Sequence, residues 1–159
     1  MTIRIIALLF FAITLCSAET FNVKEFQSRL NEKWKSQDVN GMKAVVENFR
    51  GKFADDPAFV ASIFQFYVYV DQNYEKTQKL TKELLFFIDA HGNNDDKLLA
   101  HEILKMTLNI PKNEFKPYSK DQIAALHKSF PNYPFDIFAN GIISRIQKRQ
   151  GEQGAAANP

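Results

Sequence analysis

The stretch AFVASIFQFYVYVDQNYEK, residues 58–76, opens with an apolar run and closes with charged residues. The aromatic and β-branched side chains of residues 63–70 favour a β-strand by propensity. The apolar run from Phe59 to Val70 is nevertheless long for a strand, and no other segment of the chain offers a strand with which it could pair. We therefore predict a helix that is apolar on nearly all sides and lies at the centre of the fold.

The segments on both sides of this stretch carry the periodicity of amphipathic helices. Their apolar residues recur at spacings of three and four, which places them on one face of a helix. With the central helix they make about seven helices, and the expected inner faces of the other six are Val23, Phe26, Leu30 and Trp34; Val39, Met42, Val45, Val46, Phe49 and Phe53; Leu80, Leu84, Phe87 and Ile88; Leu99, Ile103 and Met106; Ile123, Leu126 and Phe130; and Phe135, Phe138, Ile142 and Ile146.

Polar residues, prolines and one glycine stand where these helices should begin and end. Such residues satisfy the backbone groups that a helix leaves unpaired at its ends. The expected N-caps, first-turn residues and C-terminal glycine are Asn22 with Glu25, Asp38, Asp56 with Pro57, Ser119 with Gln122, Pro134 and Gly92. The sequence therefore predicts an all-α fold, a compact antiparallel array of helices.

The first 18 residues have the pattern of a secretory signal peptide. Arg4 precedes an apolar run from Ile5 to Leu15, and small residues precede a cleavage point after Ala18. The apolar run is too short to span the roughly 30 Å of hydrocarbon in a bilayer. We therefore expect a secreted, extracellular chain with one helical domain at residues 19–149 and, because residues 150–159 lack apolar periodicity, a flexible tail.

Charge and cysteine content narrow the class of protein further. Without residues 1–18 the chain has 19 basic and 18 acidic residues, so its net charge is +1. This charge is too small to predict binding to nucleic acid or to an anionic membrane surface. The only cysteine is Cys16, so the remaining chain forms no disulfide and depends on its apolar core. We expect no membrane-spanning segment in the mature chain.

Two segments start in a similar way about 35 residues apart. QDVNGMKAVVENF, residues 37–49, and QNYEKTQKLTKEL, residues 72–84, each place a helix after a Gln-Asp or Gln-Asn turn. Residues 22–90 thereby resemble tetratricopeptide repeats, which are helical hairpins of about 34 residues. Gln65, Thr77 and Leu84 replace small residues that such repeats use where helices cross, so the resemblance implies a degenerate helical-hairpin solenoid.

Metal-binding motifs are incomplete in this chain. HEILK, residues 101–105, has Lys105 where a zinc-protease helix needs its second histidine. DAHGNNDDK, residues 89–97, lacks the glycine and glutamate of an EF-hand loop, and a helix end followed by a helix start explains it. The remaining metal hypothesis is a weak surface site that uses His91, Asp95 or Asp96.

No catalytic motif is present either. The chain has no glycine-rich phosphate loop and no Gly-X-Ser-X-Gly sequence, so we expect neither an enzyme nor a cofactor. The dibasic pair Lys148-Arg149 would suit a processing protease, but cations also stabilise the C-terminal end of a helix, and we favour that interpretation.

Two functions fit these observations. The favoured one is a secreted, non-catalytic module that binds a protein partner through its helical surface. The alternative is an extracellular carrier that holds an apolar, fatty-acid-like molecule in a cavity between helices, because such cavities are lined mainly by apolar and aromatic groups. For the carrier, the expected wall residues are Phe64, Tyr67, Phe87 and Phe138.

Overall fold

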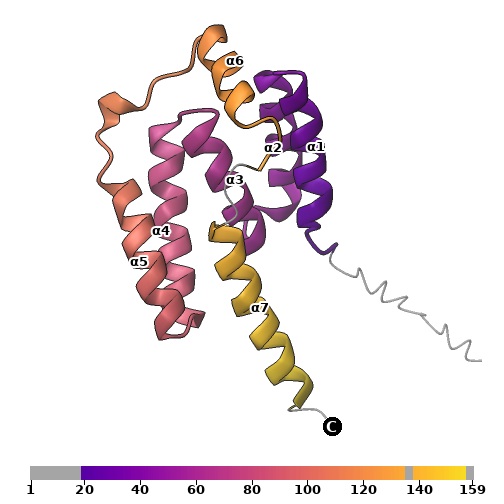
Figure 1. The fold of residues 1–159 in the computed structure, drawn as a ribbon. Helices are drawn as coiled ribbons and strands as arrows, with labels where there is room; N and C mark the ends of the chain where they lie inside the picture. Colours follow the sequence, from indigo (N-terminus) through magenta and orange to yellow (C-terminus); the bar gives the residue numbers. More distant parts are fainter. Residues whose placement is uncertain (1–18, 135–137, 157–159) are drawn as a thin grey trace, which may run out of the picture.

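The computed structural model describes residues 19–134 and 138–156. In these two ranges the chain forms seven α-helices and one short 3₁₀ helix, and no strand. The elements are α1 (Val23–Lys35), α2 (Val39–Phe53), α3 (Pro57–Tyr69), α4 (Tyr74–His91), α5 (Asn94–Leu108), η1 (Lys112–Glu114), α6 (Lys120–Ser129) and α7 (Phe138–Ala156) (Figure 1). The predicted all-α fold of about seven helices is confirmed.

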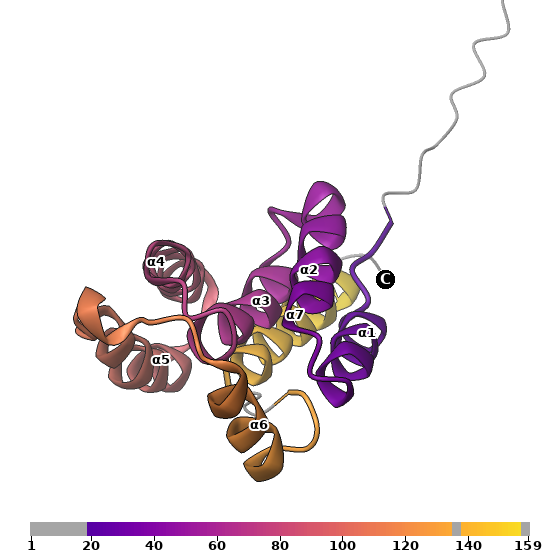
Figure 2. The ribbon, with the colours of Figure 1, turned by 90° about the horizontal axis from the view of Figure 1, so that it is seen from above.

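Helix α3 is the central element of the structure. Every residue from Ala58 to Val68 is buried, so the quoted apolar run is a helix covered on all sides rather than a strand. Helix α3 packs against α1, α2, α4 and α7, and Figure 2 shows it between α4 on one side and α2 on the other. The length of the run decided its conformation against the β propensity of its side chains, because a lone strand would leave its backbone groups unpaired.

An aromatic cluster closes one end of the core. Phe21 precedes α1 and contacts Phe26 and Phe59 with ring centroids 5.6 and 5.3 Å apart, in edge-to-face arrangements. Phe49 of α2 lies 5.0 Å from Phe26. Such pairs add to the stabilisation from burial alone, so this cluster fixes α1 and α2 against the start of α3.

The predicted inner faces of α1, α2 and α4 are confirmed, but that of α5 is wrong. Leu99 and Met106 are 38% and 63% exposed, while the buried residues of α5 are Asp96, Ala100, Leu104 and Thr107. The helix is rotated by one position because Asp96 forms ion pairs with two arginines of α7. A count of large apolar residues misses this face, since it carries a small residue and a carboxylate.

The predicted N-caps are observed. Asp56 accepts hydrogen bonds from the backbone N–H groups of Ala58 and Phe59, and Ser119 and Gln122 form a complete capping box. Gly92 ends α4 as expected, but with φ −77° rather than in the left-handed region. A Cβ atom there would lie 2.6 Å from the carbonyl oxygen of Ile88, so close packing explains this glycine.

Helix α7 differs from the prediction at both ends. Pro134, expected in its first turn, is not helical, and the described part of α7 begins at Phe138; Phe135 lies outside the described residues. It continues to Ala156, so much of the segment expected as a tail is helical. Its first half is buried through Ala139, Ile142, Ile143 and Ile146. Arg145 and Arg149 pair with Asp96 of α5, and the C-terminal end of the helix extends away from the other helices (Figure 1).

A helix that crosses a bilayer has to be both long and apolar. In residues 19–134 and 138–156, no helix combines the length and the apolar composition needed to cross a membrane. The predicted signal peptide, residues 1–18, lies outside the described residues.

Candidate functional site: a groove between α2 and α4

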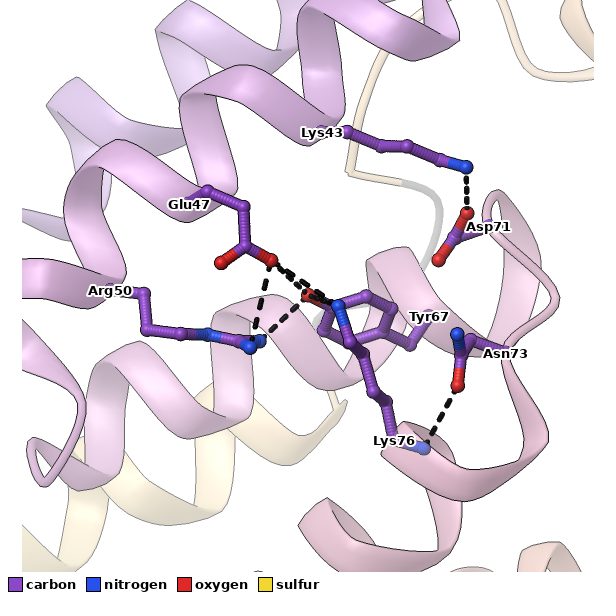
Figure 3. A network of polar contacts seen from close by, with 7 residues as sticks. All are labelled: Lys43, Glu47, Arg50, Tyr67, Asp71, Asn73 and Lys76. Carbon is purple, nitrogen blue, oxygen red and sulfur yellow. Dashed lines mark hydrogen bonds and ion pairs between the residues drawn. The ribbon is translucent and has the colours of Figure 1, made fainter.

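The hydroxyl of Tyr67 is the centre of a polar cluster that joins three helices (Figure 3). It accepts hydrogen bonds from Arg50 Nη2 of α2 at 2.7 Å and from Lys76 Nζ of α4 at 3.1 Å. It donates to Glu47 Oε1 of α2 at 3.2 Å, and Lys76 Nζ also lies 3.2 Å from this carboxylate oxygen. The cluster therefore ties α2 and α4 to the central helix.

The protonation states within the cluster follow from its surroundings. Burial raises the pKa of the Tyr67 phenol above its ordinary value, although the charges of Lys76 and Arg50 oppose that shift. Burial also acts to raise the pKa of Glu47, but its hydrogen bond with Lys76 and the charges of Arg50 and Lys76 hold that pKa below its ordinary value. At neutral pH the phenol is therefore neutral and Glu47 is ionised, so two cations face one anion.

A second pair of contacts fixes the start of α4 beside this cluster. Lys43 Nζ of α2 lies 2.5 Å from Asp71 Oδ1, whose side chain is nearly buried in the turn before α4. The side chain of Asn73 accepts a hydrogen bond from the backbone N–H of Lys76 at 3.0 Å. The groups that hold Lys76 in place thus come from both α2 and the N-cap of its own helix (Figure 3).

A small hollow of about 160 Å³ lies beside the polar cluster. Its walls combine cationic side chains with an apolar floor from α3 and α4. The residues that line it are Arg50, Ala54, Asp55, Phe59, Ile63, Lys76, Lys79, Leu80 and Glu83.

A larger hollow of about 410 Å³ shares three of these residues and continues away from the cluster. Ala54, Asp55 and Glu83 line both hollows, and Pro57, Val60, Leu84, Phe86 and Phe87 complete the larger one. Phe86 is 79% exposed at its rim. We call the two hollows together the α2–α4 groove: one end is cationic, the other is apolar, and two carboxylates lie where they meet.

The structure separates the four expected wall residues. Phe87 lines the α2–α4 groove, whereas Tyr67 is 1% exposed and directs its hydroxyl into the polar cluster beside the other end. Phe64 is buried in the core and is not among the residues that line either hollow. Phe138 begins α7, and its side chain lies outside the described part. Of the three whose side chains are described, only Phe87 lines the groove.

Sequence reasoning named Phe87 but missed the other residues that form the groove. Lys76, Leu80, Glu83 and Phe87 follow one another at spacings of three and four along α4, which places them on one face of that helix. The signal is present in the sequence, but apolar residues at this spacing equally predict a face that packs in the core. The other signal was Phe86, a large aromatic residue that lies off this stripe and that the structure shows to be exposed.

The segments considered for metal binding have other partners. His101 Nε2 lies 2.6 Å from Asp89 Oδ1 and so links α5 to α4. Asp96 is buried and accepts hydrogen bonds from Arg145 and Arg149, which leaves it unsuited to a surface metal site. Among the described residues, no group of three or more histidine, cysteine, aspartate or glutamate side chains is placed to hold a metal ion.

The chain was also compared with known proteins. No protein-family model, no curated protein and no solved structure matches it.

Proposed function

We propose that this protein is a secreted, non-catalytic interaction module that binds a segment of a partner protein in the α2–α4 groove. The observation that carries the proposal is Phe86, which stands 79% exposed at the rim of an apolar hollow of about 410 Å³. A large aromatic side chain costs free energy when exposed to water, and aromatic residues are enriched among the anchors of protein interfaces. Covering Phe86 with a partner side chain would recover that free energy.

The open shape of the groove supports a protein partner over an enclosed ligand. Ala54, Asp55, Glu83 and Phe86 line the larger hollow and are all exposed. Pockets for small molecules usually bury most of the ligand surface. A groove that leaves one side to solvent instead suits a segment whose own outer side faces water.

The alternative function, carriage of an apolar fatty-acid-like molecule, would use the same groove. It is favoured by one observation: the apolar end with Val60, Leu84 and Phe87 leads to a cationic end with Arg50 and Lys76. A carboxylate could pair with the cations while an alkyl chain covers the apolar residues. In this arrangement the molecule lies in the α2–α4 groove, which takes the place of the predicted cavity between helices.

The helical-hairpin arrangement belongs to the same proposal. Helices α1 and α2 pack together, as do α3 and α4, and α1 also packs against α3. These contacts support a degenerate, tetratricopeptide-like stack of two hairpins over residues 22–90. Stacked helical hairpins form extended grooves that suit the binding of partner segments.

Peptide selection on the purified protein tests the proposed function. Random peptides displayed on phage are selected for binding, and enriched peptides are measured against Phe86→Ala. We expect at least a tenfold loss of affinity, because the variant lacks the anchor, and no loss with Leu98→Ala, a matched control that is 65% exposed on α5. Failure to enrich any peptide, or equal binding by both variants, would contradict the proposal.

The same variants distinguish the carrier. A fluorescent fatty acid is titrated into the wild-type protein, Phe86→Ala and Leu98→Ala. Saturable binding that Phe86→Ala weakens, together with failed peptide selection, would establish carriage as the function. Absence of saturable binding would eliminate it.

A further inference from the structure

Charged and apolar residues are ordered along the α2–α4 groove. On α4 the order is Lys76 and Lys79 first, Glu83 next, and Phe87 last. The 11 residue steps from Lys76 to Phe87 correspond to roughly 16 Å along a helix with a rise of 1.5 Å per residue. This is the length of about three turns, with the carboxylate two turns from the first cation.

Side chains on the side of the groove that faces α4 follow the same order. Arg50 lines the cationic hollow, Asp55 lines both hollows as Glu83 does, and Pro57 lines the apolar hollow. Along the groove, α4 and the residues opposite it therefore carry the same sequence of charge types. A partner that lies between them meets positive charge, then negative charge, then an apolar surface.

These charges are available to a partner. Arg50 and Lys76 share the single carboxylate of Glu47, so the cationic end keeps a net positive charge. Lys79 and Glu83 pair at 3.6 Å with side chains that are well exposed, and such surface pairs are weak enough to exchange partners. Asp55 makes no ion pair or hydrogen bond from its carboxylate within the described residues.

The backbone of the groove favours a helical partner segment. An extended peptide that binds by strand addition needs an exposed sheet edge, and the described residues contain no strand. A helix satisfies its own backbone groups and needs only side-chain contacts from the groove. An amphipathic helix placed along α4 also has the same rise per residue, so its side chains can stay level with those of α4.

Building on the proposed function, we propose that the partner segment is an amphipathic helix with three ordered residues. An acidic residue pairs with Arg50, Lys76 and Lys79. A basic residue about two turns further pairs with Asp55 and Glu83. An aromatic or large aliphatic residue about one turn beyond that covers Phe86 and Phe87.

The same order of charges acts against a fatty acid. An alkyl chain that runs from the cations to Phe87 has to pass Asp55 and Glu83, whose carboxylates are hydrated and gain nothing from contact with it. A basic side chain at that level would pair with them instead. The middle of the groove therefore distinguishes the two occupants.

A matched pair of helical peptides tests this inference. Both are alanine-rich and have the same composition; one carries Glu, Lys and Phe in the proposed order and spacing, and the other has Glu and Lys exchanged. Fluorescence polarisation with the wild-type protein should give at least tenfold tighter binding for the first peptide. Phe86→Ala should weaken the binding of the first peptide at least tenfold.

A double variant of the protein provides the reciprocal test. Lys79→Glu combined with Glu83→Lys keeps the ion pair at the same spacing and keeps the net charge, but reverses its direction along the groove. The preference for the first peptide should fall at least threefold, while the thermal unfolding midpoint should stay close to that of the wild type.

The outcomes separate the inference from the proposed function. Equal binding of the two peptides would overturn the charge order, while the proposed function would stand if binding depends on Phe86. Binding of neither peptide would overturn the helical partner. If the selection yields no Phe86-dependent peptide either, the proposed function fails with it.

Discussion

Tyr67 shows how one side chain serves both the core and the surface. Its ring is buried in α3, while its hydroxyl is the shared partner of Arg50, Lys76 and Glu47. The sequence predicts a buried ring, since Tyr67 belongs to the apolar run. It gave no reason to expect the polar partners, because they come from two other helices and meet only in the folded chain.

Replacing Tyr67 should separate these two roles. Tyr67→Phe keeps the ring and removes only the hydroxyl, so we expect a loss of roughly 0.5–1.5 kcal/mol in the free energy of unfolding. Tyr67→Ala also leaves a cavity, and we expect a loss of about 3–5 kcal/mol. Urea unfolding measures both. Equal losses for the two variants would show that the hydroxyl, rather than the ring, dominates.

Phe64 and Phe86 should differ sharply in the same experiment. Phe64 is 5% exposed, so Phe64→Ala should lower the free energy of unfolding by about 3–5 kcal/mol. Phe86 is mostly in water, so Phe86→Ala should change it by less than about 0.5 kcal/mol. A large destabilisation by Phe86→Ala would mean that this ring stabilises the fold and is not an exposed contact for a partner.

At the scale of elements, prediction succeeded where one helix face carries large apolar residues. Helices α1, α2 and α4 bury the stripes that their spacing predicts. Helix α5 does not, because its orientation depends on the ion pairs of Asp96 with α7, a partner about 50 residues away in sequence. The groove likewise depends on residues that are far apart in the sequence. Helix α4 supplies half of its lining, and α2, the turn after it and α3 supply the rest.

The contact between α5 and α7 should make the free energy of unfolding depend on pH in the acidic range. Burial acts to raise the pKa of Asp96, but its hydrogen bonds with Arg149 and Arg145 hold that pKa below its ordinary value. The folded protein therefore binds this proton less readily than the unfolded chain does. The stabilisation is complete above the ordinary carboxyl pKa of about 4 and is lost as the pH falls through the lower, folded value.

Asp96→Asn measures that contribution. At pH 7 we expect the variant to lose roughly 1.5–3 kcal/mol in the free energy of unfolding, since it replaces charge-assisted hydrogen bonds. The difference from the wild type should shrink as the pH falls below about 4, because the wild-type carboxylate becomes protonated. A difference that is constant from pH 7 to pH 2.5 would contradict this account. Asp95→Asn, an exposed neighbour, is the control.

At the scale of the whole molecule, the chain combines a disulfide-free core with a predicted secretory leader. The buried phenylalanines of the core are Phe21, Phe26, Phe53, Phe59, Phe64 and Phe66. Their burial stabilises the fold without the disulfides on which many small secreted domains depend. The all-α class followed from the sequence because nearly every segment has helical periodicity. The groove did not follow, since the relative placement of helices is decided by packing between distant residues.

Secretion itself is open to a direct measurement. If residues 1–18 are a cleaved signal peptide, protein recovered from the culture medium should begin at Glu19 and have the mass of 141 residues. Intact-mass spectrometry with N-terminal sequencing measures both quantities. Retention inside the cell with Met1 in place would contradict the predicted route.

The ion pair of Arg149 with Asp96 also determines how the chain resists proteases. Lys148-Arg149 is a dibasic sequence, but it lies inside a helix and its arginine is engaged by a buried carboxylate. Proteolytic cutting concentrates on exposed, locally unfolded backbone, so this bond stays intact while α7 is docked. Once α7 separates from α5, the same two residues become a cleavage site. The rate at which a trypsin-like protease cleaves at Lys148-Arg149 therefore reports how often α7 separates from α5. Asp96→Asn should increase this cleavage rate.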